Sequence, residues 1–248
     1  MRLNKYIAEM GLCSRREADR LIAGGRVTVN GRAAGLGDQV GETDEVAVNG
    51  KALRQKLPER VVLAYYKPVG VTCTARDRHA EKTVADALGY PTRLTYAGRL
   101  DRAAEGLLLM TNDGDLIEAL MRGSHGHEKE YLVKVNKKIT DDMIERLQAG
   151  VFLPDLGATT RPCQAEAVGE RTLRLILTQG LNRQIRRMCE ACGLRAVRIK
   201  RLRVANVRLG QLKPGEYREV RGAELAELYK MCGRGDVDIA PYDRHSET

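Results

Sequence analysis

Residues 98–114 read Gly-Arg-Leu-Asp-Arg-Ala-Ala-Glu-Gly-Leu-Leu-Leu-Met-Thr-Asn-Asp-Gly. An irregular segment, 93–96, precedes Asp101, and the apolar run 107–110 follows it and ends at an Asn-Asp-Gly turn signal. We therefore predict a loop that leads into an interior strand. A carboxylate at such a junction is held rigidly and partly withdrawn from water, conditions that suit a nucleophile or a general base.

The same tripeptide Arg-Leu-Asp also has an ordinary interpretation. An aspartate between a loop and a strand is usually a turn former or the partner of an arginine. From residues 98–114 alone, both interpretations of Asp101 stay open.

The composition excludes several classes of protein. The chain has 248 residues, of which 43% are apolar, so it is long enough to bury a core without disulfide bonds. No apolar run approaches the roughly 20 residues of a membrane span, and residues 1–5 show no apolar core of a signal peptide. We therefore expect a cytoplasmic protein without a membrane partner.

The cysteines indicate a reduced protein without a metal site. The six are scattered along the chain, and Cys189 and Cys192 form the single Cys-x-x-Cys pair. A zinc site needs a second pair of ligands, and none follows at ligand spacing. We interpret both cysteines as helix packing and expect no metal.

The basic charge is concentrated rather than spread evenly. The net charge is +9 and the pI about 9.3, which favours a polyanionic partner. Residues 182–204 contain eight basic residues and one acid. Within this run Arg183, Arg186 and Arg187 have the spacing i, i+3, i+4, which predicts one helix face suited to phosphate oxygens.

The N-terminal part repeats this pattern, with a net charge of +4 over residues 1–32 and −4 over residues 33–50. A run of charge is most often a solvated helix face. Two polarised basic patches nevertheless favour nucleic acid. Because the chain has one Phe and no Trp, aromatic stacking on single strands is not the expected mode.

Residues 1–50 have the pattern of a compact module. Helical spacing over residues 3–10 ends at Gly11, and Ser14 with Glu17 forms a capping box for a second helix over 15–22. A strand over 27–29 follows, then a hairpin turn at Asn30-Gly31 and a second strand over 45–48.

The rest of the chain predicts strands with helices interspersed. Strands are expected over 61–66, 130–135 and 173–177, and helices over 82–88, 140–149 and 182–192. Because the order is not a strict alternation, we predict an α+β fold rather than a doubly wound sheet. The predicted division is a module at 1–50, a linker at 51–60, a second domain at 61–232 and a flexible tail at 233–248.

The first module resembles the S4 RNA-binding domain over its whole length. The resemblance rests on residues 2–7, 13–19, 27–31 and 37–38. It implies that Arg15, Arg16 and Arg20 line an RNA-phosphate surface.

Four further motifs follow in order. They are Lys67-Pro68-Val69-Gly70, Gly98-Arg99-Leu100-Asp101, Lys129-Glu130-Tyr131-Leu132-Val133 and the run 180–189 that contains Leu181-Asn182-Arg183-Gln184. Together they resemble the RsuA-type branch of RNA pseudouridine synthases over nearly the whole chain. The sub-pattern 127–131 with 181–184 looks most like the large-subunit pseudouridine synthase F group. The implied fold is a mixed, mainly antiparallel sheet with flanking helices behind the S4-like module.

The resemblance implies isomerisation of uridine to pseudouridine, in which the N1–C1′ bond breaks, the base turns and C5 bonds to C1′. No cofactor is needed. Asp101 is the implied carboxylate, which either attacks C1′ or assists loss of the C2′ proton. Arg186 is implied as the cation that keeps Asp101 ionised, and Tyr131 as the tyrosine that stacks on the base.

The expected partner is structured RNA, whose loops and bulges present accessible bases. The resemblance implies a uridine of large-subunit ribosomal RNA, with a transfer-RNA anticodon-loop uridine as a second possibility. No interface signature suggests more than a monomer, so we expect a monomeric enzyme. The uridine must leave its stack to reach Asp101. The residues predicted to bind this substrate are Lys67, Arg99, Arg183 and Arg187, together with the three S4 arginines.

One position departs from the family pattern, and two other functions stay open. The family has Thr or Ser three residues after the aspartate, where this chain has Ala104; a lost hydroxyl would loosen the loop. A non-catalytic S4-type ribosome-assembly factor would explain the charge equally well. A nucleic-acid glycosylase would also place an aspartate near an extruded base, but it would release that base.

Overall fold

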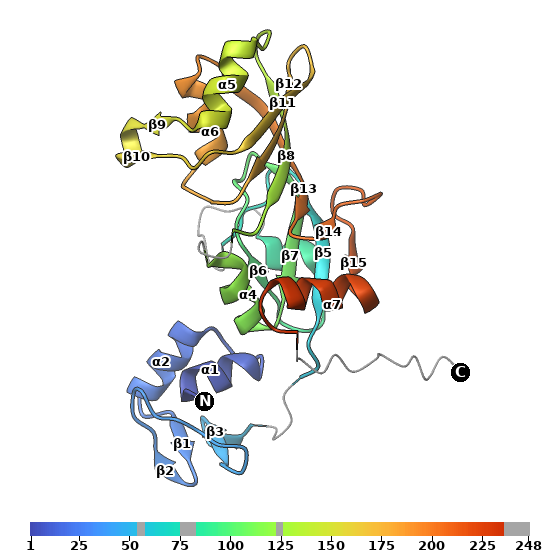
Figure 1. The fold of residues 1–248 in the computed structure, drawn as a ribbon. Coiled ribbons are helices and arrows are strands. Elements are labelled where there is room, and N and C mark those ends of the chain that lie inside the picture. Colours follow the sequence, from blue (N-terminus) through green and yellow to red (C-terminus); the bar gives the residue numbers. More distant parts are fainter. Residues whose placement is uncertain (54–57, 75–82, 123–125, 236–248) are drawn as a thin grey trace, which may run out of the picture. The chain divides into compact units, whose positions relative to one another are not determined.

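The computed structural model describes residues 1–53, 58–74, 83–122 and 126–235 (Figure 1). The chain divides into two compact units. One contains residues 1–60 with the short segments 91–93 and 112–114, and the other contains residues 61–90, 94–111 and 115–248.

The first unit combines two helices with a small sheet. The helices are α1 (Leu3–Glu9) and α2 (Arg15–Ala23). The sheet has the order β2-β1-β3-β4 and consists of β1 (Val27–Val29), β2 (Arg32–Ala33), β3 (Val46–Val48) and β4 (Lys51–Ala52). Apolar side chains of both helices and of β1 and β3 form its core.

Local signals in the sequence account for these elements. The Ser14 hydroxyl accepts a hydrogen bond from the Glu17 backbone N–H at 3.2 Å, which confirms the predicted start of α2. Asn30 and Gly31 have φ of 50° and 76°, the positive values that a two-residue hairpin turn requires. The strand β2 was not predicted, because both of its residues are exposed and no apolar alternation marks it.

The second unit is built on one large sheet. Among the described residues nine strands join it, in the order β11-β12-β8-β13-β7-β5-β15, with β14 paired to β13 and β6 to β7. The strands are β5 (Val62–Lys67), β6 (Thr95–Ala97), β7 (Glu105–Thr111), β8 (Lys129–Val135), β11 (Gln164–Gly169), β12 (Thr172–Leu177), β13 (Ala196–Val204), β14 (Val207–Arg208) and β15 (Tyr217–Glu219). The pairing of β13 with β7 is parallel and the other pairings are antiparallel, which confirms the predicted α+β class.

Helices cover both faces of this sheet. They are α3 (Val84–Leu88), α4 (Gly114–Met121), α5 (Asp141–Ala149), α6 (Gln184–Ala191) and α7 (Gly222–Met231). Figure 1 shows α5 and α6 beside β8 and β12, where Leu147 and Met188 share a core with Val133 and Leu175. A small hairpin of β9 (Phe152–Leu153) and β10 (Ala158–Thr159), joined by the 3-10 turn Pro154–Leu156, lies next to α6.

The centre of the sheet is buried on both faces. In β7 all seven residues are buried, which confirms the interior strand predicted after Asp101. Leu107 and Leu109 pack with α4 and α7, whereas Leu108 and Met110 pack with α3 on the other face.

Several predicted elements differ from the structure. The segment 93–96, expected to be irregular, contributes to β6, whose Thr95 pairs with Thr111. The Asn-Asp-Gly signal at 112–114 leads into α4 rather than into a simple turn. Lys82, the expected start of a helix, lies outside the described residues, and α3 begins after Thr83, whose side chain accepts from the Asp86 N–H in a capping box.

The helix predicted over 182–192 is shorter in the structure. Of the three arginines predicted to share its face, Arg183 does not lie on it. Arg183 precedes α6 and has a left-handed backbone with φ of 51°. It therefore does not continue the face that carries Arg186 and Arg187. By contrast, the helix predicted over 140–149 is present as α5, and Thr140 caps it, since its hydroxyl accepts from the Met143 N–H.

Candidate active site

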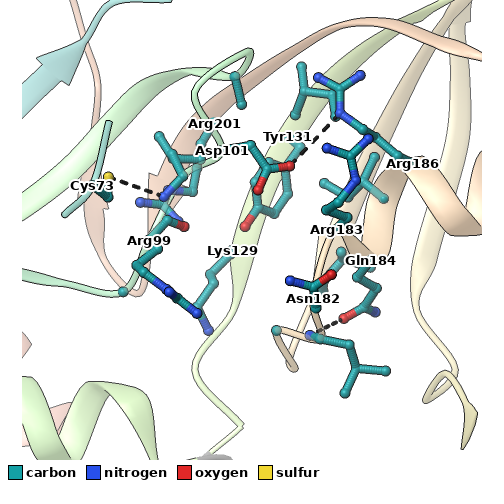
Figure 2. Close-up of a pocket in the computed structure, with 18 of the residues that line it drawn as sticks. Cys73, Arg99, Asp101, Lys129, Tyr131, Asn182, Arg183, Gln184, Arg186 and Arg201 are labelled. Atoms are coloured by element: carbon teal, nitrogen blue, oxygen red, sulfur yellow. Dashed lines mark hydrogen bonds and ion pairs between the residues drawn. The ribbon is translucent and has the colours of Figure 1, made fainter. Parts of the chain in front are cut away.

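A cavity of about 430 Å³ opens in the second unit over the centre of the sheet. Its floor comes from β8 and β13, and its walls come from the loop 98–104, the segment 72–74 and the loop 179–183 that leads into α6. Figure 2 shows the side chains that converge on it. A volume of this size is in the range of small-molecule sites.

Asp101 lies in the loop between β6 and β7, with its side chain 38% exposed. The Ala104 N–H donates to the Asp101 carbonyl at 3.0 Å, which closes a tight turn directly after the carboxylate. Ala104 is itself buried in the core, so the turn forms without the hydroxyl that the family pattern has there. The carboxylate is therefore held firmly while it stays accessible from the cavity.

Arg186 is the cation nearest to this carboxylate, with its Nε 3.8 Å from Oδ2 of Asp101. Its Nη1 donates to the Ala196 carbonyl at 3.1 Å and its Nη2 to the Ala103 carbonyl at 3.4 Å. Arg186 thus ties α6 to β13 and to the Asp101 turn. The pairing that the sequence predicted between Asp101 and Arg186 is present as an ion pair.

Tyr131 lies on β8 beside this pair, 8% exposed and lining the cavity. The strand predicted over 130–135 is present in β8, and Tyr131, Val133 and Val135 alternate along it into the same core. Figure 2 shows Tyr131 and Asp101 among the side chains that line the same cavity. A planar aromatic side chain in this position can support the face of a base.

Two further cations form the floor of the cavity. Lys129 precedes Tyr131 by one full strand repeat, and its Nζ donates to the His127 carbonyl at 3.2 Å. Burial, together with the charge of Arg201, lowers the pKa of Lys129 to about 8. Arg201 is 2% exposed, and it donates to the carbonyls of Leu107 and Arg99.

The charge of the cavity is strongly positive. Among the described lining residues, six side chains are cationic and one, that of Asp101, is anionic. The cations are Arg99, Arg102, Lys129, Arg183, Arg186 and Arg201. Such a site attracts a polyanion and leaves one carboxylate available for chemistry.

The environment of Lys67 differs from the one expected of a substrate-binding residue. Lys67 has no exposed surface, and its Nζ donates to the carbonyls of Pro68 and Val71 at 2.9 and 2.8 Å. The turn that it stabilises contains Gly70, whose N–H donates to the Arg102 carbonyl at 2.8 Å. The structure therefore does not place Lys67 at the cavity; its contacts support the loop that carries Asp101.

The other predicted substrate-binding arginines divide into two groups. Arg99 and Arg183 are exposed and line the cavity from opposite sides in Figure 2. Arg187 does not line it: its Nε donates to the Asn182 carbonyl and its Nη1 pairs with Asp155. Arg187 thus supports the loop that presents Arg183.

Comparisons with known proteins identify this arrangement. The family model for RNA pseudouridylate synthase matches residues 61–191, and the S4 domain model matches residues 1–46. The chain belongs to the RNA pseudouridylate synthase family. It is an RNA pseudouridine synthase, an isomerase, with an N-terminal S4 domain.

Individual relatives agree with this assignment. The synthase is 44% identical to the dual-specificity RNA pseudouridine synthase RluF of Salmonella typhi, over 97% of this chain and 82% of the relative. It is 38% identical to the ribosomal large subunit pseudouridine synthase B of Pseudomonas aeruginosa, over 96% of this chain and 64% of the relative. A crystal structure of a pseudouridylate synthase matches with a TM-score of 0.67 and 28% identity, covering 93% of this chain and 99% of that one.

The arginines predicted to bind RNA in the S4 domain lie on α2. Arg15, Arg16 and Arg20 are all exposed, and Arg20 pairs with Glu17 at 2.6 Å. Arg16 and Arg20 are four residues apart and share a helix face.

The cysteines of the Cys-x-x-Cys pair pack in the core of the synthase, as predicted. Cys189 and Cys192 are both buried, and burial raises the pKa of Cys189 to about 12. In the described part of the chain no group of three His, Cys, Asp or Glu side chains is arranged to hold a metal ion. Within the same ranges, every helix is too short or too polar to span a bilayer.

Sequence reasoning missed two residues of the cavity floor. Lys129 could have been found, because it shares the strand face of Tyr131 at i and i+2. Arg201 was not predicted as a site residue, because it lies within a run of basic residues that shows no clear strand pattern.

Proposed function

We propose that this synthase isomerises a uridine of large-subunit ribosomal RNA, with Asp101 as the residue that acts at the target sugar. The observation that carries the proposal is the Asp101–Arg186 ion pair at 3.8 Å inside a cavity whose other charged lining residues are cations. The names of the relatives, a dual-specificity synthase and a ribosomal large-subunit synthase, support the choice of RNA. A transfer-RNA anticodon-loop uridine is the second substrate that we propose.

The reaction divides among three residues. Asp101 either attacks C1′ or assists loss of the C2′ proton while the N1–C1′ bond breaks, and the base then turns. When C5 bonds to C1′, the Asp101–C1′ bond of the first route breaks, or C2′ regains its proton in the second. C5 loses its proton to solvent and N1 takes one up, so the composition of the nucleotide is unchanged. Arg186 places a positive charge opposite the Asp101 carboxylate and orients it. Tyr131 supports the face of the turning base. Since bonds are exchanged within one nucleotide, neither a redox partner nor a group donor takes part.

RNA binding divides between the cavity and the S4 domain. We propose that Arg99 and Arg183 contact phosphates at the rim, while Lys129 stabilises the nucleotide from the floor. Arg15, Arg16 and Arg20 bind phosphates of the same RNA through the S4 domain. These contacts offset the cost of unstacking the target uridine.

The proposed division of the chain is the S4 domain at 1–50, a linker at 51–60, the catalytic domain at 61–232 and a tail at 233–248. Residues 54–57 of the linker and 236–248 of the tail lie outside the described residues. We propose that the enzyme acts as a monomer in the cytoplasm. The unit 61–90, 94–111 and 115–248 contains every described residue of the cavity, which supports one complete site for each chain.

Mapping pseudouridine in cells tests this function. Carbodiimide treatment and primer extension are applied to ribosomal and transfer RNA from cells with the gene, without it, and rescued by wild type, Asp101→Asn or Asp142→Asn. Asp142 is an exposed aspartate on α5 and is the matched control. A stop that disappears on deletion and returns with wild type and Asp142→Asn, but not with Asp101→Asn, is expected; stops that are unchanged in every strain would contradict the proposal.

A further inference from the structure

We propose that Arg201 is a positioning residue of the reaction, which fixes the backbone on both sides of Asp101 and is retained for that purpose at a cost in stability. This inference rests on the proposed role of Asp101. It concerns a residue that makes no ion pair with Asp101 and that acts through the loop.

Arg201 occupies the centre of the sheet under the cavity. On β13 it is the register partner of Tyr131 on β8 and of Gly106 on β7. Its side chain is 2% exposed and lines the cavity. Arg201 therefore lies between the strand that carries Tyr131 and the strand that follows Asp101.

The backbone around Arg201 leaves little freedom for movement. Gly106 has φ of +109°, and a Cβ at this position would lie 2.3 Å from the Arg201 carbonyl oxygen. No side chain fits there, so β7 and β13 approach each other more closely than two ordinary residues allow. This close contact fixes the position from which the Arg201 side chain extends.

The guanidinium of Arg201 connects both ends of the Asp101 loop. Its Nε donates to the Leu107 carbonyl at 2.7 Å, and its Nη1 donates to the Arg99 carbonyl at 3.5 Å. Arg99 precedes Asp101 and Leu107 follows it. One rigid, planar group thus sets the distance between the two segments that flank the carboxylate.

The same burial is not favourable for folding. Nη2 of Arg201 is buried and has no hydrogen-bond partner, which leaves a desolvated donor uncompensated. The charge of Arg201 also acts on Lys129, where it helps to lower the pKa. An apolar side chain in this place would avoid both costs but would leave the Leu107 and Arg99 carbonyls without this donor. Hydrophobic packing therefore does not explain a buried charge here.

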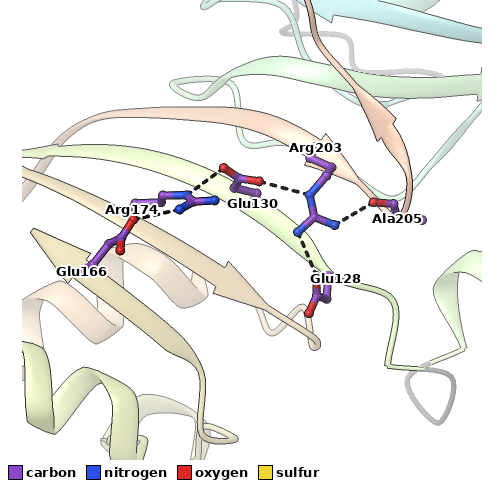
Figure 3. A network of polar contacts seen from close by, with 6 residues as sticks. All are labelled: Glu128, Glu130, Glu166, Arg174, Arg203 and Ala205. Carbon is purple, nitrogen blue, oxygen red and sulfur yellow. Dashed lines mark hydrogen bonds and ion pairs between the residues drawn. The ribbon is translucent and has the colours of Figure 1, made fainter. Parts of the chain in front are cut away.

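The test separates rate from stability and from RNA binding. Wild type, Arg201→Lys, Arg201→Met and Asp101→Asn are compared as full chains on large-subunit ribosomal RNA from cells lacking the gene. The matched control is Arg203→Lys, on the same strand. As Figure 3 shows, Arg203 binds Glu130, Glu128 and the Ala205 carbonyl, and none of these lines the cavity.

We expect both Arg201 variants to lose about a hundredfold in the single-turnover rate constant, because a misplaced carboxylate attacks poorly. Their Kd for RNA is expected to stay within about threefold of wild type, since exposed cations supply most of the affinity. The Tm of Arg201→Met is expected within about 5 °C of wild type or above it. Arg203→Lys is expected to keep the wild-type rate.

A second measurement does not depend on the folding of the methionine variant. Arg201→Ala leaves an empty space where the arginine side chain lay. Millimolar guanidinium can fill that space and is therefore expected to restore part of the rate of this variant. Tetramethylammonium at equal ionic strength is not expected to do so. Failure of guanidinium to restore any rate would overturn the proposal.

Two results of the first comparison would also overturn it. One is a wild-type rate in a folded Arg201→Met when Asp101→Asn is inactive. The other is a loss of rate that runs parallel to a loss of Tm, with Arg203→Lys behaving in the same way, because both effects would then be structural. If instead Asp101→Asn retained the full rate, the proposed role of Asp101 itself would fail, which is a distinct outcome.

Discussion

The Nε atom of Arg186 lies 3.8 Å from Oδ2 of Asp101, while the two terminal nitrogens of the same guanidinium donate to the carbonyls of Ala196 and Ala103. Arg186 therefore combines two tasks. It supplies the charge opposite the carboxylate, and it holds the turn on which the carboxylate lies.

Replacing Arg186 separates these tasks. Arg186→Lys keeps the charge but loses the planar fork, and Arg186→Met loses both. We expect the single-turnover rate to fall about tenfold in the lysine variant and about a thousandfold in the methionine variant. Equal losses in the two variants would mean that the charge opposite Asp101 contributes nothing.

Ala104 provides a test of the departure from the family pattern. Its N–H already closes the turn to the Asp101 carbonyl, and its side chain is 2% exposed. We expect Ala104→Ser to change the single-turnover rate by less than about fivefold, because the added hydroxyl has no turn left to close. A gain of a hundredfold would show that the loop is too loose without it.

The lowered pKa of Lys129 predicts that the activity depends on pH. Its pKa of about 8 means that the cavity loses a cation as the pH rises through that value. We expect kcat/KM to fall about tenfold above pH 8 in wild type, since the attraction for RNA phosphate weakens. The variant Lys129→Arg stays charged over the same range and is expected to keep kcat/KM level, because a guanidinium does not lose its proton there. Identical profiles of the two enzymes would exclude Lys129.

The lowered pKa of Lys67 predicts instead that the free energy of unfolding depends on pH. Burial lowers its pKa from 10.5 to about 8. Between these values the unfolded chain holds more protons than the folded one, so the free energy of unfolding rises with pH. Relative to Lys67→Met, wild type is expected to gain on the order of 3 kcal/mol between pH 8 and 10.5 in denaturant titrations.

The Kd for RNA supplies the second readout for Lys67. Because its Nζ donates to two carbonyls and its side chain does not line the cavity, Lys67→Met is expected to leave the Kd unchanged in a folded protein. A Kd that weakens strongly at constant stability would return Lys67 to the substrate-binding residues predicted from the sequence.

Removing the S4 arginines is expected to weaken the dependence of RNA binding on salt concentration. Replacing Arg15, Arg16 and Arg20 together by Gln is expected to lower the slope of log Kd against log salt by about 3, roughly one for each phosphate contact. The turnover of bound RNA should not change. Arg32→Gln, an exposed arginine on β2 outside α2, is the control; an equal effect there would mean that the charge is not localised on α2.

The structure brings together the three residues that the sequence predicted as catalytic, whereas the residues around them were predicted less well. Asp101, Tyr131 and Arg186 belong to three separate segments, and all three line one cavity. Motif order identified them because each motif is local. Lys67 belonged to a motif as well, but sequence alone could not distinguish a lysine that contacts substrate from one that supports a turn.

The missed elements have physical reasons. The alternation of β13 is interrupted by shifts of register between Ala196 and Arg198 and between Arg201 and Arg203, so its period of two is hidden. The helix α4 begins at Gly114, inside an Asn-Asp-Gly signal that usually marks a turn. Arg183 left the expected helix face because its backbone is left-handed.

The most direct measurement is the turnover and RNA binding of purified Asp101→Asn on large-subunit ribosomal RNA from cells lacking the gene. The substitution removes the negative charge and preserves the shape of a side chain that is already 38% exposed. We predict that pseudouridine formation is abolished while the Kd for RNA stays near the wild-type value. Pseudouridine formed by Asp101→Asn at the wild-type rate would contradict the account.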